Sequence, residues 1–362
     1  MIIRNFFRCY SLNPTTSKIV EQKCLQLAVI GSPNVGKSLL TNSLVRCPLS
    51  AVSSKMDTTT RNISASICED STQLVFVDSP GAVSTSHVRE TMKHRGSQGE
   101  KLLQDPERAL RNAQHILVVQ DSTAPGSYIH HRVLHMLHRY SHVPSTLVMN
   151  KIDLVTRRSD LLPLVEILTN GELSDNQKIA TKPAQIGRLG KSLNTVNANV
   201  SIEPTDEKWK NSYRTIFGWS GFERVFFVSS LTGEGIDDLR THLLNISPNG
   251  DWKMNESIPT SESAQQLCID SIRAAVLDTT PSDVAYTVVP KIVEWEEQGE
   301  ILQIVGEIKC KKSRDGVLVI GKGGRRISEI GRRVNEHLHS LFQRQLYCRL
   351  IVTHNGKLIT SS

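Results

Sequence analysis

The stretch Gly31-Ser32-Pro33-Asn34-Val35-Gly36-Lys37-Ser38 decides the fold class of this 362-residue chain. It directly follows a short apolar run, residues 25–30, and precedes the helical run LLTNSLV. A strand, a glycine-rich loop and a helix in this order predict a phosphate-binding loop. Gly31 and Gly36 let the backbone curl, so that its N–H groups and the helix N-terminus converge on phosphates. Lys37 then reaches the β and γ oxygens, and the Ser38 hydroxyl ligates Mg²⁺.

Short apolar runs alternate with helical stretches from residue 25 to about residue 244. This alternation is typical of parallel strands joined by crossover helices. The runs are nearly continuous in hydrophobicity, as expected for strands buried on both faces of a sheet. They cover residues 25–30, 74–77, 116–119, 146–149 and 225–228. We therefore predict an α/β domain with a mostly parallel sheet.

A carboxylate and a glycine follow the second run, in Asp78-Ser-Pro-Gly81. The carboxyl end of a parallel strand is where ligands of open α/β sheets bind. We expect Asp78 to hold Mg²⁺ through a water, and the Gly81 N–H to reach the γ-phosphate. The segment after Gly81 would then change conformation on hydrolysis.

The motif Asn150-Lys151-Ile152-Asp153 follows a later run and selects the base. A carboxylate at Asp153 accepts hydrogen bonds from both the ring N–H and the exocyclic amine of guanine, a donor pair that adenine lacks. Lys151 would lie over the base plane, and Asn150 would brace neighbouring loops. The predicted ligands are GTP and GDP.

These motifs, together with the Thr-Thr-Arg of DTTTRN and the Ser-Ser of VSSLTG, resemble translation-factor-related GTPases, and most of all the Era family. The resemblance covers roughly residues 24–357. It implies that Ser229, Ser230 and Leu231 contact guanine and that a switch I threonine ligates Mg²⁺. The candidate threonines are Thr58, Thr59 and Thr60; we favour Thr59, although one extra residue precedes Arg61. The resemblance further implies that Asn34 holds a monovalent cation such as K⁺, acting beside Lys37 in catalysis.

Hydrolysis is expected to be slow, because Ala82 follows Gly81 where Ras-like proteins use a glutamine. One alternative is therefore an RNA-binding protein whose nucleotide domain has lost useful turnover. A second, an RNA-dependent ATPase or helicase, is opposed by the guanine motif. A tandem GTPase of the EngA type would need two phosphate loops, and this chain has one.

The C-terminal part contains a second glycine-rich loop, Gly321-Lys322-Gly323-Gly324, followed by Arg325 and Arg326. Upstream lie a helical pattern over residues 264–277 and two strand-like runs, 285–294 and 301–309. This setting predicts an α+β KH domain of type II, whose G-x-x-G loop binds RNA. Nine basic residues between 309 and 333 concentrate positive charge beside the loop. Ile320 and Ile327 either form a base-binding groove or pack under the loop.

The expected domain layout follows from these motifs and from two polar stretches. We expect a GTPase domain over residues 24–246, interrupted by a disordered insertion at about 171–221. A linker is expected over residues 247–263, and the KH domain over residues 264–357. No run of about 18 apolar residues occurs, so no membrane span is expected.

The first 20 residues carry Arg4, Arg8 and Lys18, and no acid precedes Glu21. This composition is typical of a mitochondrial presequence, with a frayed cytosolic tail as the alternative. The net charge of +7 favours a polyanionic partner. Together with the family resemblance, it implies binding to small-subunit ribosomal RNA and assembly of the small ribosomal subunit. We expect this to occur in the mitochondrial matrix, with peripheral inner-membrane contact left open; a bacterial-type or cytosolic assembly GTPase is the alternative.

Overall fold

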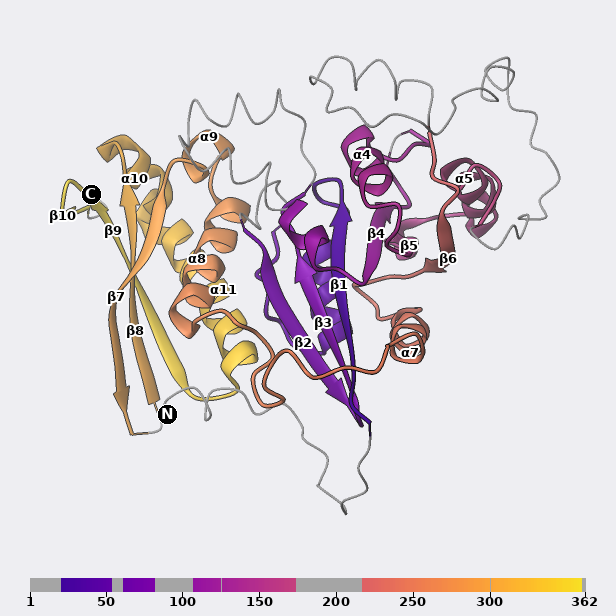
Figure 1. The fold of residues 1–362 in the computed structure, drawn as a ribbon. Helices are drawn as coiled ribbons and strands as arrows, with labels where there is room; N and C mark the ends of the chain where they lie inside the picture. The colour runs from indigo at the N-terminus through magenta and orange to yellow at the C-terminus, as the bar shows by residue number, and fades with distance from the viewer. Residues whose placement is uncertain are drawn as a thin grey trace.

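The computed structural model describes residues 21–53, 61–81, 107–124, 126–173, 217–299 and 301–359. Within them the chain forms two sheets, each with its own helices (Figure 1). The presequence, the three switch I threonines and residues 174–216 of the predicted insertion lie outside the described residues.

The larger sheet has six strands in the order β2-β3-β1-β4-β5-β6. Its parallel strands are β1 (Lys23–Gly31), β3 (Thr72–Asp78), β4 (His115–Asp121), β5 (Ser145–Asn150) and β6 (Phe222–Phe227). The predicted, mostly parallel sheet is confirmed. The edge strand β2 (Ile63–Glu69) pairs antiparallel with β3, and no expectation from the sequence included it.

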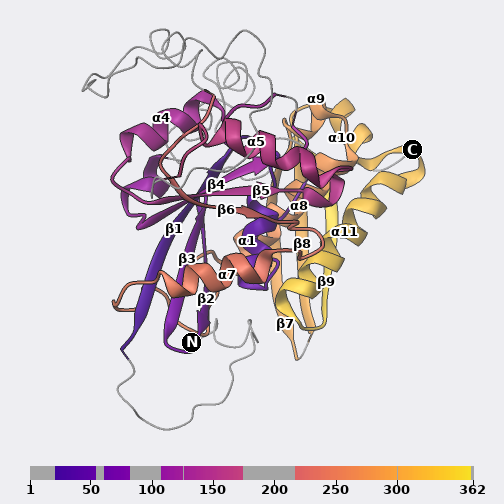
Figure 2. The same cartoon turned by 90° about the vertical axis from the view of Figure 1, so that its right-hand side faces the viewer.

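Helices cover both faces of this sheet (Figure 2). One face packs against α1 (Lys37–Val45) and α7 (Ile236–Asn245). The other packs against α4 (His131–Arg139) and α5 (Leu161–Leu168). The 3₁₀ turns η2 (Ile152–Leu154) and η3 (Arg158–Asp160) follow β5. Because Val29 pairs with Asp78, and Asp121 with Asn150, the polar strand ends meet at one edge of the sheet.

The second sheet has the order β10-β9-β8-β7 and belongs to the C-terminal domain. Strands β8 and β9 pair parallel, whereas β7 and β8 pair antiparallel. Helix α9 begins at Ser282, so β7 starts later than the predicted strand at residue 285. The order helix, two strands, two helices, strand is that of the predicted type II KH fold. Its elements are α8 (Ala264–Thr279), α9 (Ser282–Ala285), β7 (Val289–Gln298), β8 (Ile301–Cys310), α10 (Ser313–Ile320), η4 (Lys322–Gly324), α11 (Arg325–Phe342), β9 (Leu346–His354) and β10 (Lys357–Leu358).

The segment predicted as a linker, residues 247–263, lies along the β2 and β3 edge of the larger sheet. The fully buried Gln73 side chain accepts hydrogen bonds from the backbone N–H groups of Lys253 and Met254, at 2.8 and 3.0 Å. Farther along, the Thr260 hydroxyl donates to the carbonyl of Ser64 at 2.8 Å. The connection between the domains is therefore fixed to the sheet by hydrogen bonds.

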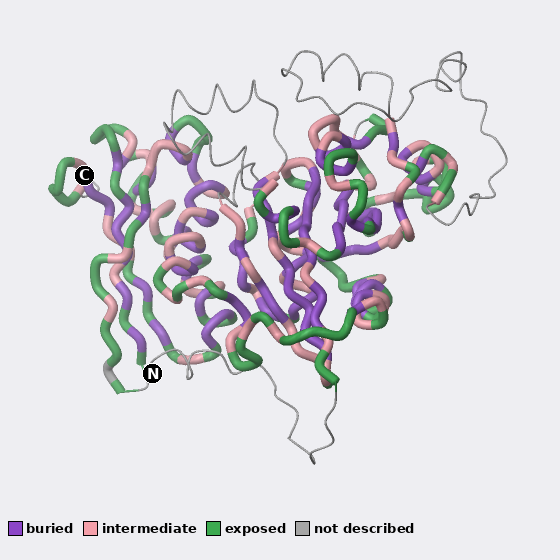
Figure 3. Tube along the Cα trace, in the orientation of Figure 1, coloured by how far each residue is buried: buried purple, intermediate pink, exposed green. Residues whose placement is uncertain are grey.

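Helices α8 and α11 lie between the two sheets (Figures 1 and 3). Buried residues of both helices join the apolar cluster that also contains α1 and α7. A continuous apolar core thus links the two domains, and it holds the second glycine-rich loop in a defined position relative to the first. In the part of the chain that the structure describes, no helix combines the length and apolarity needed to cross a bilayer.

Candidate nucleotide site and RNA interface

The phosphate loop connects the end of β1 to the start of α1. Gly36 caps α1 with φ 94°, a left-handed conformation that L side chains avoid. The Lys37 ammonium is buried and donates to the carbonyls of Gly31 and Ser32, at 3.2 and 2.8 Å. Lys37 therefore folds back over the loop that would enclose the phosphates.

Asp78 lies fully buried at the end of β3, beside the phosphate loop. Burial raises the pKa of its carboxyl to about 6, although a hydrogen bond with Ser38 and the charge of Lys37 oppose the rise. One of its oxygens, Oδ2, accepts a bond from the Ser50 hydroxyl at 3.4 Å, and the other, Oδ1, has no hydrogen-bond partner among the residues that the structure describes. A buried carboxylate oxygen without a partner beside a hydroxyl suits a hard, oxygen-binding cation such as Mg²⁺.

Gly81 lies against the phosphate loop. A Cβ atom built on Gly81 would be 2.7 Å from the Cα of Pro33, so only glycine permits this approach. The backbone after Asp78 consequently passes next to the phosphate loop, and the contact of the Gly81 N–H with a γ-phosphate stays a prediction.

Asn150 joins the phosphate loop to the loop after β6. Its side chain is buried and donates to the carbonyl of Val35 at 2.9 Å. The same side chain accepts from the backbone N–H and the hydroxyl of Ser230, at 3.0 and 2.9 Å. These hydrogen bonds join the two loops, which is the arrangement that the predicted bracing role of Asn150 requires.

Lys151 bridges the phosphate loop and the end of β4. Its ammonium donates to the carbonyl of Asn34 at 2.6 Å and to the Asp121 carboxylate at 2.7 Å. Burial opposes ionisation of Asp121, but hydrogen bonds from Lys151 and Thr123 lower the pKa of its carboxyl. Sequence reasoning missed Asp121, although a carboxylate two positions after the apolar run 116–119 was a usable signal.

Asp153 is exposed, and one of its oxygens accepts from the Ser229 hydroxyl at 2.6 Å. Ser229 is fully buried, and its hydroxyl also accepts a hydrogen bond from the N–H of Thr232. Ser229 therefore holds the Asp153 carboxylate in place while that carboxylate stays exposed. Leu231 is 74% exposed on the same loop. The carboxylate and an apolar side chain are thus both exposed in the loops that follow β5 and β6.

The second glycine-rich loop joins α10 to α11 in the C-terminal domain. Gly323 has φ 59°, and a Cβ atom there would meet nothing within 4 Å. Lys322 and Arg325 are exposed, and the Arg326 guanidinium donates to the carbonyl of Leu318. Ile320 is buried in the core, so it packs under the loop, whereas Val317 of the same helix is 56% exposed.

A cavity of about 390 Å³ lies beside this loop. Four basic side chains line it together with two acidic ones, so the local charge is positive. Phosphate groups of a nucleic acid are the anions that such a loop and basic rim would attract. The lining residues are Asp278, Thr279, Gly321, Lys322, Arg325, Arg326, Glu329 and Arg333.

A family model described as "50S ribosome-binding GTPase" matches residues 26–151. The chain is 77% identical to "GTPase Era, mitochondrial" of Caenorhabditis elegans, over 94% of this chain and 92% of the relative. It is 31% identical to the protein of the same name from Danio rerio, over 88% and 73% of the two chains.

Two solved structures share the fold over most of this chain. One is Era in complex with MgGDPNP and nucleotides 1506–1542 of 16S ribosomal RNA, with a TM-score of 0.65 and 23% identity. The other is a variant of Aquifex aeolicus Era bound to GDP and aluminium fluoride, with a TM-score of 0.66 and 23% identity. Each covers 92% of this chain and is itself covered to 94%.

Proposed function

Because the chain belongs to the Era family of GTPases, we propose that it binds small-subunit ribosomal RNA through its KH domain and assists assembly of the mitochondrial small ribosomal subunit. GTP hydrolysis is the reaction of the family. The observation that carries the RNA assignment is the open loop around Gly323, with Lys322 and Arg325 exposed beside the basic cavity. The relative of known structure in complex with 16S ribosomal RNA supports the same target.

The nucleotide would bind at the carboxyl ends of the parallel strands of the larger sheet. Residues 31–38 and the N–H of Gly81 would bind the phosphates, and Asp153 with Lys151 would bind guanine. Asn150 would hold the two loops together while Ser229, Ser230 and Leu231 border the base. These roles are supported by the hydrogen bonds that join the phosphate loop, the loop after β5 and the loop after β6.

Mg²⁺ is the metal that the site would hold, with Ser38 and Asp78 as ligands and a switch I threonine as a further one. Bound there, the ion neutralises negative charge on the β and γ oxygens during phosphoryl transfer. The chain's own contribution is to bind and orient: Lys37 reaches the phosphates, and Gly81 donates an N–H. A K⁺ ion beside Asn34, an exposed residue of the phosphate loop, would add positive charge at the same place.

A mitochondrial location is supported by the relatives named mitochondrial Era, one of them 77% identical. We place the protein in the matrix, where the small ribosomal subunit is assembled. Contact with the inner membrane would be peripheral, and would use the positive charge that also attracts RNA.

Gly323→Asp is expected to weaken binding of a mitochondrial small-subunit rRNA transcript at least about tenfold, because it adds a negative charge where the backbone approaches phosphate. Its left-handed backbone, with φ 59°, adds strain for any side chain. Binding is measured by fluorescence anisotropy with the full chain, and GTP affinity should stay unchanged.

The matched control is Gly299→Asp in the β7–β8 turn. Gly299 has φ 62° and open space around its Cα, like Gly323, but lies outside the loop. The control variant should bind RNA within about twofold of the wild type. Equal RNA affinity in the Gly323 variant, or no preference of the wild type for small-subunit over large-subunit rRNA, would contradict the proposed function.

A further inference from the structure

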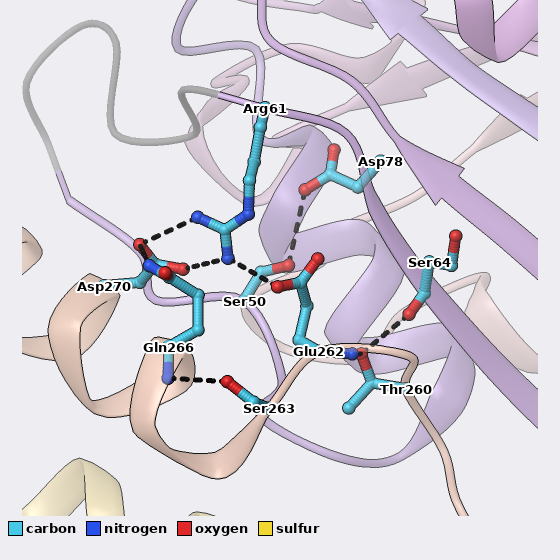
Figure 4. Close-up of polar contacts among 9 residues, drawn as sticks. All are labelled: Ser50, Arg61, Ser64, Asp78, Thr260, Glu262, Ser263, Gln266 and Asp270. Atoms are coloured by element: carbon cyan, nitrogen blue, oxygen red, sulfur yellow. Dashed lines mark hydrogen bonds and ion pairs between the residues drawn. The ribbon is translucent and has the colours of Figure 1, made fainter.

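Ser53 and Arg61, which lie on either side of the predicted switch I threonines, both contact helix α8 of the KH domain. The Ser53 hydroxyl donates to the Asp278 carboxylate at 2.7 Å. On the other side, Arg61 contacts Asp270 and Glu262 (Figure 4). Asp270 and Asp278 belong to the same helix, α8, and lie about two turns apart. Thus one helix of the RNA-binding domain binds the residues on either side of the predicted switch threonines.

The contact at Arg61 has the geometry of a strong ion pair. Its two terminal nitrogens donate to both oxygens of Asp270, at 3.3 and 2.8 Å, in a fork arrangement. One of them also donates to Glu262 at 2.8 Å. All three side chains are largely shielded, with 30%, 13% and 18% exposure for Arg61, Asp270 and Glu262. We call this group the Arg61 clamp.

The clamp lies next to the predicted metal carboxylate. Strand β2 begins at Ile63, which pairs with Asp78, so Arg61 is located just two residues before the strand partner of Asp78. On the other side of the segment, Ser50 contacts Asp78 directly and is held on α1 by Asn42. The clamp therefore holds the start of β2 close to Asp78, on the side of the site where the γ-phosphate would bind.

We propose that Asp270 and Glu262 are positioning residues for GTP hydrolysis, which act through Arg61 by holding the start of β2 beside Asp78. The carboxylates lie in and next to a helix of the KH domain, so the second domain completes the nucleotide site of the first. The inference rests on the proposed nucleotide site and is independent of which RNA is bound.

A route toward the RNA loop follows from the same helix. Asp278, which accepts from Ser53, also lies 3.6 Å from the guanidinium of Arg333. Arg333 lines the basic cavity with Lys322 and Arg325. A phosphate that binds Arg333 would compete with Asp278 for this cation. Helix α8 thereby offers a physical connection between the RNA cavity and the segment beside Asp78.

The test compares the full chain with Asp270→Asn, which has nearly the same shape but cannot form the ion pair. We expect kcat for GTP to fall about tenfold, a change equal to about 1.4 kcal/mol in activation free energy. The preference for GTP over GDP should fall by a similar factor, while GDP affinity stays within twofold of the wild type. The reason is that the clamp supports the γ-phosphate side, whereas GDP uses the phosphate loop and the guanine loops.

Arg61→Gln combined with Asp270→Asn should lower kcat no more than Arg61→Gln alone, because Arg61→Gln already removes the contacts with both carboxylates. Asp283→Asn, an exposed acid of α9, is the control and should leave kcat unchanged. If Asp270→Asn lowers the folded yield, Glu262→Gln removes the negative charge of the second acceptor in the clamp and should give a smaller loss of the same kind.

Equal losses of GTP and GDP affinity, additive effects in the double variant, or an unchanged kcat would overturn the positioning role. The assays contain no RNA. A wild type that fails to bind rRNA would therefore contradict the proposed function while leaving the outcome of this test intact.

Discussion

An Asp153→Asn variant is expected to bind GTP about 10²- to 10⁴-fold more weakly, because two charge-assisted hydrogen bonds of about 1.5–3 kcal/mol each are lost. The carboxylate is exposed, and the Ser229 hydroxyl donates to one of its oxygens at 2.6 Å, so its position is held while its charge stays accessible. The amide presents a donor where guanine also presents one. Xanthine carries an acceptor there, so XTP should bind the variant better than it binds the wild type.

Competition between labelled GDP and unlabelled GTP, XTP and ATP measures this change in specificity. Asp238→Asn, an exposed acid on α7, controls for the loss of one negative charge near the site. An Asp153→Asn variant that kept its preference for GTP over XTP would exclude Asp153 as the base-reading residue.

A Gly36→Ala variant is expected to lose GTP and GDP affinity about 100-fold or more, since it disturbs several donors to the phosphates together. The added Cβ would lie 2.4 Å from the amide nitrogen of Asn150. Asn150 has little room to move, because it is buried and bonded to both Val35 and Ser230. The left-handed backbone at Gly36, φ 94°, adds strain for any side chain.

Gly171→Ala separates the clash from the backbone strain. Gly171 also has a positive φ, 76°, but nothing lies within 4 Å of the added atom. Isothermal titration of both variants with GDP, after thermal unfolding has shown that each is folded, gives the comparison. Near-normal affinity in Gly36→Ala would mean that Asn150 does not hold the phosphate loop in the way its hydrogen bonds indicate.

The strands that position the candidate nucleotide site were predictable because they depend on local patterns. Residues 31–38, Asp78 and Asn150 each follow a continuous apolar strand, and parallel pairing brings such strand ends together. Strand β2 was missed for a local reason as well. Its sequence, ISASICE, contains two serines and a small alanine, and it occupies an edge of the sheet where β3 is the one described strand beside it.

Contacts between the domains were not predictable in the same way. Arg61 and Asp270 are separated by 209 positions, and no spacing rule connects them. The fixing of residues 247–263 to the sheet depends on Gln73, a polar residue that precedes the apolar run 74–77 of β3. The sequence also left the role of Ile320 open until its burial placed it under the glycine-rich loop.

The proposed function requires one chain to combine a GTPase with a KH domain that binds mitochondrial small-subunit rRNA. Crosslinking the protein to RNA in cells, followed by sequencing of the bound RNA, identifies the RNA that the KH domain binds. We expect enrichment of mitochondrial small-subunit rRNA with the wild type and with Gly299→Asp, and its loss with Gly323→Asp. Enrichment of cytosolic transcripts, or equal recovery with Gly323→Asp, would contradict it.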